Sequence, residues 1–307
     1  MSSFRRYSSI LLLLGILPLA GCLFRTHKVE QNLSPVALKS ATKPELISYI
    51  NSQAARVQTM QATVDIDTAV GGAKKGKVTE YKEIRGYVLA KKPAMLRMIG
   101  LLPIIRNTAF DMVSDGHQFK LSIPPKNRFV VGRNDVTTPN PQQPLESLRP
   151  KIIYDALLLR PIDQQHGEWP VMENSTETVR GDKGKKFEQP DYVIDVIQSD
   201  NGNAWLSRKI VFNREDLLPN RQLIYDESGN LVTDARYSEY KDYNEVLFPS
   251  RIEILRPEEE YDITLHMVQL KINLPLDTNK FVLEKPAGAQ EIHLDGQPAP
   301  SSSGGTH

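Results

Sequence analysis

The sequence predicts a mainly β-sheet protein with about a dozen strands, one helix at the start of its domain and one near the middle. Three observations lead to this fold class. Apolar and polar residues alternate in short segments along most of the chain, which is typical of half-buried strands. Turn residues such as Asp115-Gly116 separate these segments by hairpin-length links, which favour antiparallel pairing of neighbours. Apolar residues make up 40% of the 307 positions, enough for a sizeable core.

The domain is expected to begin with a helix. Thr42 is the expected cap, Pro44 lies in the first turn and Glu45 completes a capping box. Apolar residues then recur at helical spacing, namely Leu46, Ile47, Ile50, Ala54 and Val57. From Met60 to Val70 the period changes to two, which predicts a half-buried strand. A Gly/Lys turn leads into a second strand that ends near Ala90.

The same alternation predicts further strands on both sides of a second helix. These strands are expected near residues 95–99, 110–112, 119–123, 191–198, 204–213, 220–226, 231–241, 247–256 and 260–273. The helix is expected within Leu145–Leu159, with an apolar stripe formed by Ile152, Ile153, Ala156 and Leu157. We favour one domain, residues 43–286, over the two that about 150 residues per domain would also allow. After Pro286 the chain is rich in Gly, Pro and Ser, so residues 287–307 are expected to be a disordered tail.

The N-terminus has the features of an export signal. Arg5 and Arg6 precede an apolar run at 10–20, which is too short for the ~20 residues that a membrane-spanning helix needs. The run ends in Leu19-Ala20-Gly21-Cys22 and contains the chain's only cysteine. This tetrapeptide resembles the bacterial lipobox, which implies that residues 1–21 are a signal peptide and that Cys22 is lipidated and acylated. The alternative is a buried or incidental cysteine.

The residues after Cys22 predict where such an anchor would reside. Leu23 and Phe24 follow the cysteine, and the absence of an aspartate there implies export to the outer membrane. Residues 22–42 are mostly polar without a sustained apolar period, and a flexible segment of this length spans about 25 Å. We therefore expect a lipid-anchored protein of the cell envelope, tethered to the outer membrane and facing the periplasm.

Composition and motif content exclude several function classes. Lys and Arg total 38 against 37 Asp and Glu, so the charge gives no reason to expect a nucleic-acid partner. A single cysteine excludes an internal disulfide and a multi-cysteine metal site. Gly71–Lys77 nearly matches a phosphate-binding loop, but Val78 stands where a serine or threonine is needed. No hydrolase, zinc-protease or EF-hand motif is present, so we expect no catalytic residues, no metal and no cofactor.

One turn is unusually apolar. Gly100-Leu101-Leu102-Pro103-Ile104-Ile105 contains turn residues, yet nearly every other position is large and apolar. Turns normally lie on the surface and are polar. The segment is therefore either a buried strand end or a tip that contacts lipid.

Three stretches resemble the LolA/LolB-like family of lipoprotein carriers and receptors. The first runs from Met95-Leu96-Arg97-Met98 through Gly100-Leu101-Leu102 to Asp115-Gly116. The second comprises Pro144-Leu145-Glu146-Ser147-Leu148, the Ile152–Leu159 helix and Arg160-Pro161. The third comprises Tyr240-Lys241-Asp242-Tyr243, Phe248-Pro249-Ser250-Arg251-Ile252, Leu274-Pro275 and Phe281-Val282-Leu283. The resemblance implies a half-open antiparallel β-barrel, here of about 11–12 strands, with helices lidding an apolar cavity for acyl chains.

The resemblance also implies a site and a function. It places a membrane-touching loop at Leu101, Leu102 and Ile104, although Pro103 stands where the receptor has a glycine. Inward strand positions are expected to line the cavity, namely Val64, Ile66, Phe110, Met112, Leu121, Ile194 and Ile254. The leading hypothesis is a non-enzymatic lipoprotein that binds acyl chains or lipidated proteins and assists their sorting, with a soluble periplasmic carrier as a further partner. The alternatives are a structural or envelope-stress sensor that binds a protein partner, and a hydrolase with an unrecognised site.

Overall fold

The computed structural model describes residues 36–72, 76–103, 105–135, 149–180 and 186–294. Two compact units are distinguished, one formed by residues 1–35 with 178–188 and the other by the rest of the chain. The described residues of the first unit are 178–180, at the end of one strand, and 186–188, at the start of the next. All that follows concerns the second unit unless stated otherwise. Cys22 and residues 1–35 lie outside the described residues, as do Ile104 and residues 136–148.

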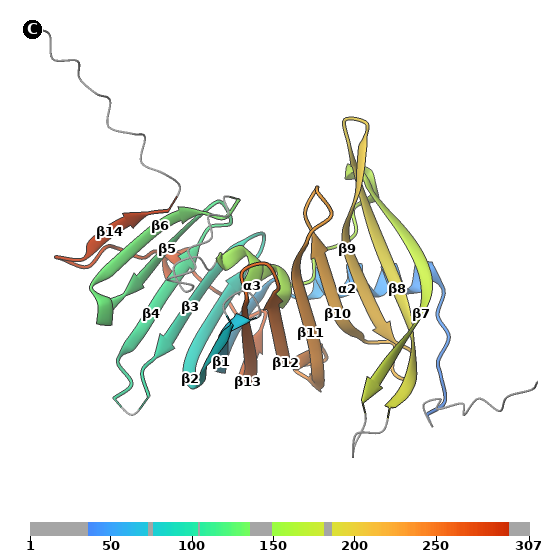
Figure 1. Cartoon of the computed structure of the whole chain (residues 1–307), viewed down its shortest axis with the longest axis horizontal. Coiled ribbons are helices and arrows are strands. Elements are labelled where there is room, and N and C mark those ends of the chain that lie inside the picture. The colour runs from blue at the N-terminus through green and yellow to red at the C-terminus, as the bar shows by residue number, and fades with distance from the viewer. Residues whose placement is uncertain (1–35, 73–75, 104, 136–148, 181–185, 295–307) are drawn as a thin grey trace, which may run out of the picture. The chain divides into compact units, whose positions relative to one another are not determined.

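The predicted fold class is confirmed, because the protein is a curled, open and mainly antiparallel sheet with few helices (Figure 1). The two α-helices are α2 (Lys43–Arg56) and α3 (Pro150–Leu157). The strands of the first half are β1 (Thr59–Gly72), β2 (Lys77–Lys91), β3 (Met95–Leu101), β4 (Thr108–Ser114), β5 (Gln118–Ile123) and β6 (Arg128–Arg133). The later strands are β7 (Glu168–Arg180), β8 (Lys186–Asp200), β9 (Asn203–Asn213), β10 (Pro219–Tyr225), β11 (Leu231–Asp242), β12 (Leu247–Arg256), β13 (Tyr261–Ile272) and β14 (Gln290–His293).

The strands form one 14-stranded sheet in the order β14-β6-β5-β4-β3-β2-β1-β13-β12-β11-β10-β9-β8-β7. The pairings from β6 through to β8 are antiparallel, and β14 lies parallel to β6. The sheet has more strands than the 11–12 expected, because β6, β7 and β14 were not predicted from the sequence. The pairing of β1 with β13 joins the two halves of the chain at the centre of the sheet, where Met60 faces Ile272.

The expected disordered tail at 287–307 is wrong in its first part. Residues 290–293 form β14, which pairs with Arg128–Val131 of β6. A four-residue strand in a polar segment has little pattern of its own, and it is held by backbone pairing to a distant strand, which local composition cannot reveal. Residues 295–307 lie outside the described residues.

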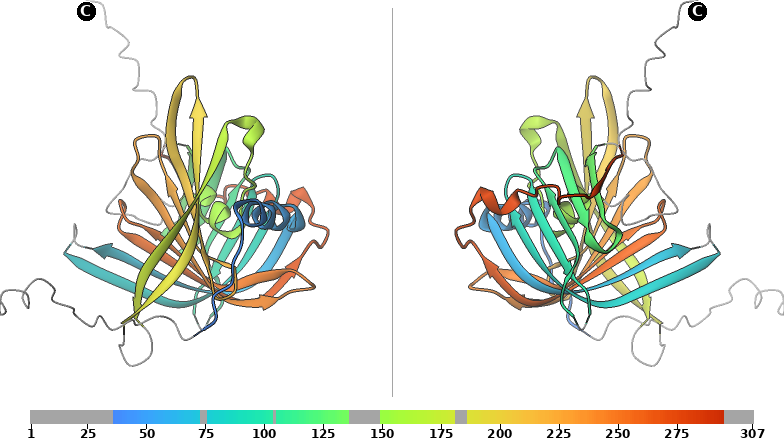
Figure 2. Two further views of the ribbon diagram at one scale, coloured as in Figure 1. Left: turned by 90° about the vertical axis from the view of Figure 1, so that its right-hand side faces the viewer. Right: turned by 90° about the vertical axis from the view of Figure 1, so that its left-hand side faces the viewer.

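Both helices cover the same face of the sheet. Residues directly opposite one another on paired strands share a face, and one row of partners runs across the later strands: Ile194, Ile210, Gln222, Ala235, Ile254 and Ile263. Ile153 and Leu157 of α3 share a core with Ile254 and Ile263 of this row. Ile50 of α2 belongs to a second core with Ile194 and Ile210. Figure 2 shows the two helices on this side of the curled sheet.

The predicted start of α2 is confirmed in detail. The Glu45 carboxylate accepts hydrogen bonds from the Thr42 backbone N–H at 2.7 Å and from the Thr42 hydroxyl at 2.8 Å. These contacts form the capping box, with Pro44 in the first turn. The helix then buries Leu46, Ile50 and Ala54, which lie on one stripe.

The C-terminal segment between β13 and β14 crosses the face of the sheet opposite the helices. Lys91 donates to the Leu276 carbonyl at 2.9 Å, and Arg97 donates to the Lys280 carbonyl at 2.8 Å. Arg97 lies between buried Leu96 and Met98, so its side chain projects from the other face. The segment therefore holds β2 and β3 on the outside before it reaches the edge strand β6.

Candidate functional site

The residues predicted to line a cavity lie in the packed core. Six of them belong to the core that α3 covers: Val64, Ile66, Met112, Leu121 and Ile254 are buried, and Phe110 is half-buried against them. Ile194 belongs to the second core, beneath α2. Other residues line the pockets described below.

An open groove runs between the two helices. It has a volume of about 640 Å³, and we call it the helix groove. Its walls come from the last turns of α2, the β2–β3 turn, and α3 with the chain that follows: Asn51, Ala54, Ala55, Gln58, Lys92, Pro93, Ala94, Gly116, Lys151, Tyr154, Asp155, Leu158, Leu159, Arg160 and Pro161. This volume lies within the range of about 300–1,000 Å³ that small-molecule sites occupy.

A smaller pocket lies beneath the groove, and we call it the inner pocket. Its lining is mostly apolar and comprises Tyr49, Gln53, Val57, Lys92, Ala156, Leu157, Leu158, Leu159, Pro219, Tyr237, Tyr240, Leu247, Phe248 and Pro249. The volume is about 40 Å³, whereas one water occupies about 30 Å³ in the liquid. Lys92, Leu158 and Leu159 line both the groove and the pocket. These three residues therefore form the wall between them.

Side chains of the sheet hold α3 over the inner pocket. Tyr237 donates its hydroxyl to the Ala156 carbonyl at 3.0 Å, and Gln222 donates to the Asp155 carbonyl at 3.1 Å. The Tyr154 hydroxyl donates to the Pro93 carbonyl at 2.6 Å and joins α3 to the β2–β3 turn. Burial raises the pKa of the Tyr237 hydroxyl, so this donor stays protonated across the physiological range. The contacts satisfy carbonyls near the C-terminal end of α3 that have no partner within the helix.

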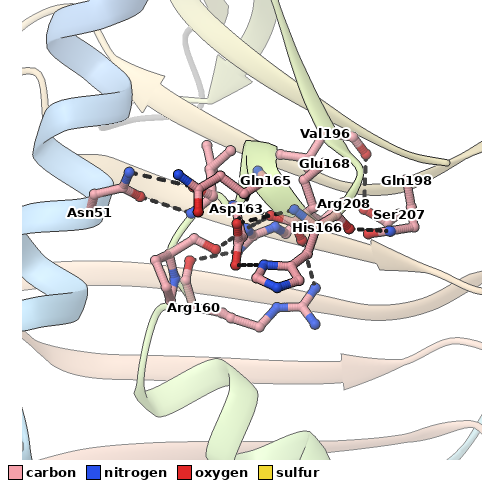
Figure 3. Close-up of polar contacts among 12 residues, drawn as sticks. Asn51, Arg160, Asp163, Gln165, His166, Glu168, Val196, Gln198, Ser207 and Arg208 are labelled. Carbon is pink, nitrogen blue, oxygen red and sulfur yellow. Dashed lines mark hydrogen bonds and ion pairs between the residues drawn. The ribbon is translucent and has the colours of Figure 1, made fainter.

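The chain that leaves α3 is fixed by a buried arginine (Figure 3). Arg208 of β9 is 2% exposed and donates to the carbonyls of Arg160 and Pro161, each at 2.7 Å. The same guanidinium contacts Oε2 of Glu168 at 3.0 Å. Glu168 also accepts from the Asp163 backbone N–H at 2.8 Å. One ion pair thus holds both ends of the segment 160–168.

Burial governs the electrostatics of this ion pair. Desolvation lowers the pKa of Arg208 to about 10, and the attraction of Glu168 opposes that shift. Glu168 is 5% exposed and has Arg160 at 3.4 Å as a second cation. A buried charge without such partners would be strongly unfavourable. Arg208 and Glu168 therefore depend on each other.

The same segment is also tied to α2. Asn51 accepts from the Ile162 backbone N–H at 2.8 Å, and its amide donates to the Ile162 carbonyl at 3.5 Å (Figure 3). The segment from Leu158 to Glu168 is consequently attached to one helix and to β9 by polar contacts. The floor of the helix groove is thus positioned by Asn51 and Arg208.

The apolar turn after β3 lies against the face opposite the helices. Leu101 and Leu102 are half-buried and line an outer cleft of about 530 Å³ with Thr63, Asp65, Arg85, Tyr87, Pro103 and Arg106. The Leu102 backbone N–H donates to the Asn107 carbonyl at 2.7 Å and closes the turn. The side chain of Ile105 in this turn is 62% exposed.

A buried carboxylate lies away from the groove. Asp191 of β8 is 1% exposed and accepts from the Gln189 amide at 3.1 Å. Desolvation raises its pKa to about 6, with further contributions from Glu177 and Glu215.

The sequence patterns did not identify the groove residues, although one signal was present. Arg208 has the same strand parity as Ile210 and Phe212, so alternation already placed its side chain inward. An inward arginine needs a partner, which points to a polar contact across the core. Lys92 had no such signal, because it lies in a turn whose position over α2 depends on the tertiary fold.

The described residues contain neither a helix suited to span a membrane nor a cluster of side chains suited to a metal ion. Within those residues, no helix combines the length and the apolar content that crossing a bilayer requires. The same part of the chain contains no group of three or more His, Cys, Asp or Glu arranged to hold a metal ion.

Comparison with known proteins gives one partial family match and several solved structures of similar fold. A family model described only as "-like: Uncharacterized protein" matches residues 171–285. No curated protein matches the sequence. A LolA superfamily protein from Nitrosomonas europaea is similar over 80% of this chain and 99% of its own, with 14% identity and a TM-score of 0.47. An outer membrane lipoprotein-sorting domain from Vibrio parahaemolyticus is similar over 76% and 95%, with 13% identity and a TM-score of 0.46.

A third solved structure shows the same level of similarity. It is a DUF1329 family protein from Desulfovibrio piger, similar over 77% of this chain and 94% of its own, with 13% identity and a TM-score of 0.46.

Proposed function

We propose that this protein is a lipid-anchored lipoprotein of the outer membrane that binds acyl chains, free or attached to proteins, and assists their sorting. The observation that supports this most directly is the arrangement of the helix groove over the inner pocket. An open groove of about 640 Å³ is separated from an apolar pocket only by Lys92, Leu158 and Leu159. No covalent step is needed for such a function.

Binding would proceed in two stages. An acyl chain first lies in the helix groove against Ala54, Pro93 and Leu159, where each buried CH₂ contributes about 0.8 kcal/mol. The inner pocket, at about 40 Å³, accepts the chain only after the segment after α3 shifts outward. That segment is held by polar contacts to Asn51 and Arg208, and it buries Leu158 and Ile162 in the two cores. The direction of transfer would follow the difference in apolar burial between donor and acceptor.

The anchor and the apolar turn would bring this site to a membrane. Lipidation of Cys22 follows from the lipobox resemblance, and the tether after it reaches the domain near the turn at 214–216. The Lys39 backbone N–H donates to the Arg214 carbonyl at 2.7 Å there. In the proposed role, Leu101 and Leu102, with Ile104 and Ile105, contact the membrane during delivery of an acyl chain.

The groove is tested by filling it. Ala55 is an exposed residue of α2 that lines the groove, and Ser52 is an exposed residue of α2 that does not. We expect photoactivatable palmitate to label the purified chain, Ala55→Trp to remove most of the labelling, and Ser52→Trp to retain it. Equal labelling of Ala55→Trp and the wild type would contradict binding in the groove. No labelling of the wild type would contradict the proposed function.

The membrane-contact role of the turn is tested separately. Ile105→Glu or Leu102→Glu is expected to slow delivery of bound palmitate to phospholipid vesicles, because a carboxylate opposes insertion of an apolar tip. Val268→Glu introduces the same charge at an exposed apolar position on β13 and serves as the control. If all three variants deliver at the wild-type rate, the turn has no role in delivery.

A second candidate function is the binding of a protein partner. The specific observation is the edge strand β7, which exposes Trp169 at 59% and Val171 at 52% at one end of the sheet. Edge strands with unpaired backbone groups accept further strands. Under this alternative, Trp169→Ser lowers retention of a membrane protein partner and leaves palmitate labelling unchanged. Under the leading proposal, Ala55→Trp lowers labelling and Trp169→Ser has no effect on it.

A further inference from the structure

Lys92 occupies a particular place in the helix groove. It lies in the β2–β3 turn and lines both the groove and the inner pocket. Its backbone N–H donates to the Gln58 carbonyl at 3.0 Å, which fixes the turn against the end of α2. The half-buried ammonium donates to the Ala54 carbonyl in the last turn of α2. The position of this cation is therefore set by two contacts to the helix end.

Other cations of the groove already have anionic partners. Lys151 contacts the Asp155 carboxylate at 2.6 Å, and Arg160 lies 3.4 Å from Glu168. Among the described residues, no carboxylate pairs with the Lys92 ammonium. Its contact with Ala54 is to a neutral carbonyl and uses one of three N–H donors. Within the part of the chain that the structure describes, Lys92 thus keeps a charge without an anionic partner and two further N–H donors.

The direction of the Lys92 pKa shift agrees with an ammonium group that has no carboxylate partner among the described residues. Burial lowers the pKa of Lys92, and no carboxylate counteracts the shift. A ligand that brings a negative charge next to Nζ would stabilise the charged ammonium and offset its desolvation in the groove. The negative end of the α2 dipole positions the cation but carries only a partial charge.

We infer that Lys92 binds the acidic group of an amphiphile whose acyl chain lies in the helix groove. This inference rests on the proposed function and specifies the ligand class. The acidic group is a carboxylate or a phosphate attached close to the chain. The apolar residues Leu158 and Leu159 contact the chain, and the ammonium selects ligands that are negatively charged where the chain begins.

The test measures selectivity rather than binding alone. The full chain is labelled with a photoactivatable monoacylglycerol, which is neutral, at concentrations below micelle formation. Competition is measured for palmitate, for palmitoyl lysophosphatidylglycerol and for neutral monopalmitoylglycerol. In the wild type we expect at least one acidic competitor to bind about tenfold more tightly than the neutral one, as for one hydrogen bond to a charged group. The competitor that shows the gain identifies a carboxylate or a phosphate as the ligand.

Three variants complete the experiment. Lys92→Met is expected to abolish the tenfold preference for the acidic competitor, and Lys92→Arg is expected to preserve it. Lys126→Met removes an exposed lysine from a distant turn and is expected to preserve it as well. If Lys92→Met does not fold, Lys92→Gln replaces it, because glutamine retains a donor for the Ala54 carbonyl.

Two outcomes would overturn the inference while leaving the proposed function intact. One is an unchanged preference in Lys92→Met, and the other is an equal loss of affinity for acidic and neutral competitors, which would indicate a structural role only. If the probe does not label the wild type at all, the proposed function fails, and the inference fails with it.

Discussion

Replacing Arg208 by methionine should strongly destabilise the fold. Arg208 is 2% exposed, and its guanidinium donates to two backbone carbonyls at 2.7 Å and to Glu168 at 3.0 Å. Methionine fills a similar volume but leaves buried Glu168 with only the largely exposed Arg160, at 3.4 Å, as its cation. Breaking a buried ion pair by removing one partner typically costs about 3–5 kcal/mol. At roughly 2–4 °C per kcal/mol for a domain of this size, Tm should fall by roughly 10 °C.

The assay is urea unfolding of the purified chain followed by far-UV circular dichroism. Glu168→Gln is the matched partner variant, and Arg208→Met/Glu168→Gln closes a double-mutant cycle. The double variant is expected to be less destabilised than the sum of the two single changes, because it leaves no unpaired buried charge. Additive effects, or a loss of under about 1 kcal/mol in Arg208→Met, would refute the buried ion pair.

Three further predictions concern stability. Thr42→Ala removes a cap that contacts Glu45 and should lower the free energy of unfolding by about 1 kcal/mol, measured by urea unfolding. Asp191→Asn should stabilise the fold at pH 7.5 and have little effect below pH 4. The pKa of Asp191 is about 6 in the folded state and near 3.9 in the unfolded state. The wild-type native state therefore loses stability as pH rises through this window, and the asparagine variant does not. Thermal unfolding as a function of pH checks this, and equal effects at both pH values would contradict it. Gly86→Ala should lower Tm, because its Cβ would lie 2.7 Å from Ile66 and 2.7 Å from a backbone carbonyl.

The predictable part of the fold is the part encoded by neighbouring residues. The Thr42–Glu45 capping box and the strict alternation from Met60 to Ile66 are local patterns, and the structure has both features. Strand β7 has no comparable pattern, because its sequence is largely polar and one of its sides borders no further strand. Its pairing with β8 depends on register rather than on burial.

The location of the groove could not be predicted for a different reason. Alternation identifies which side chains point inward, as it did for Val64 and Ile66, but it does not say which inward positions lie beneath a helix. Val64 and Ile66 lie in the core to which α3 also contributes, whereas the open groove is lined by residues such as Ala55 and Leu159. That location depends on how the helices lie across the sheet, which involves contacts between residues far apart in sequence.

The central pairing of β1 with β13 has a consequence for how this protein is made. Met60 and Ile272 face each other although they are about 200 positions apart in the chain, and such long-range pairings slow folding. During synthesis the N-terminal strands would emerge first and expose one side of β1 until almost the whole chain had been made. The nascent protein would therefore pass through a stage with a long unpaired apolar strand, which is prone to aggregate. Its folding should depend on chaperones, and pulse-chase proteolysis should detect a late, single step to protease resistance.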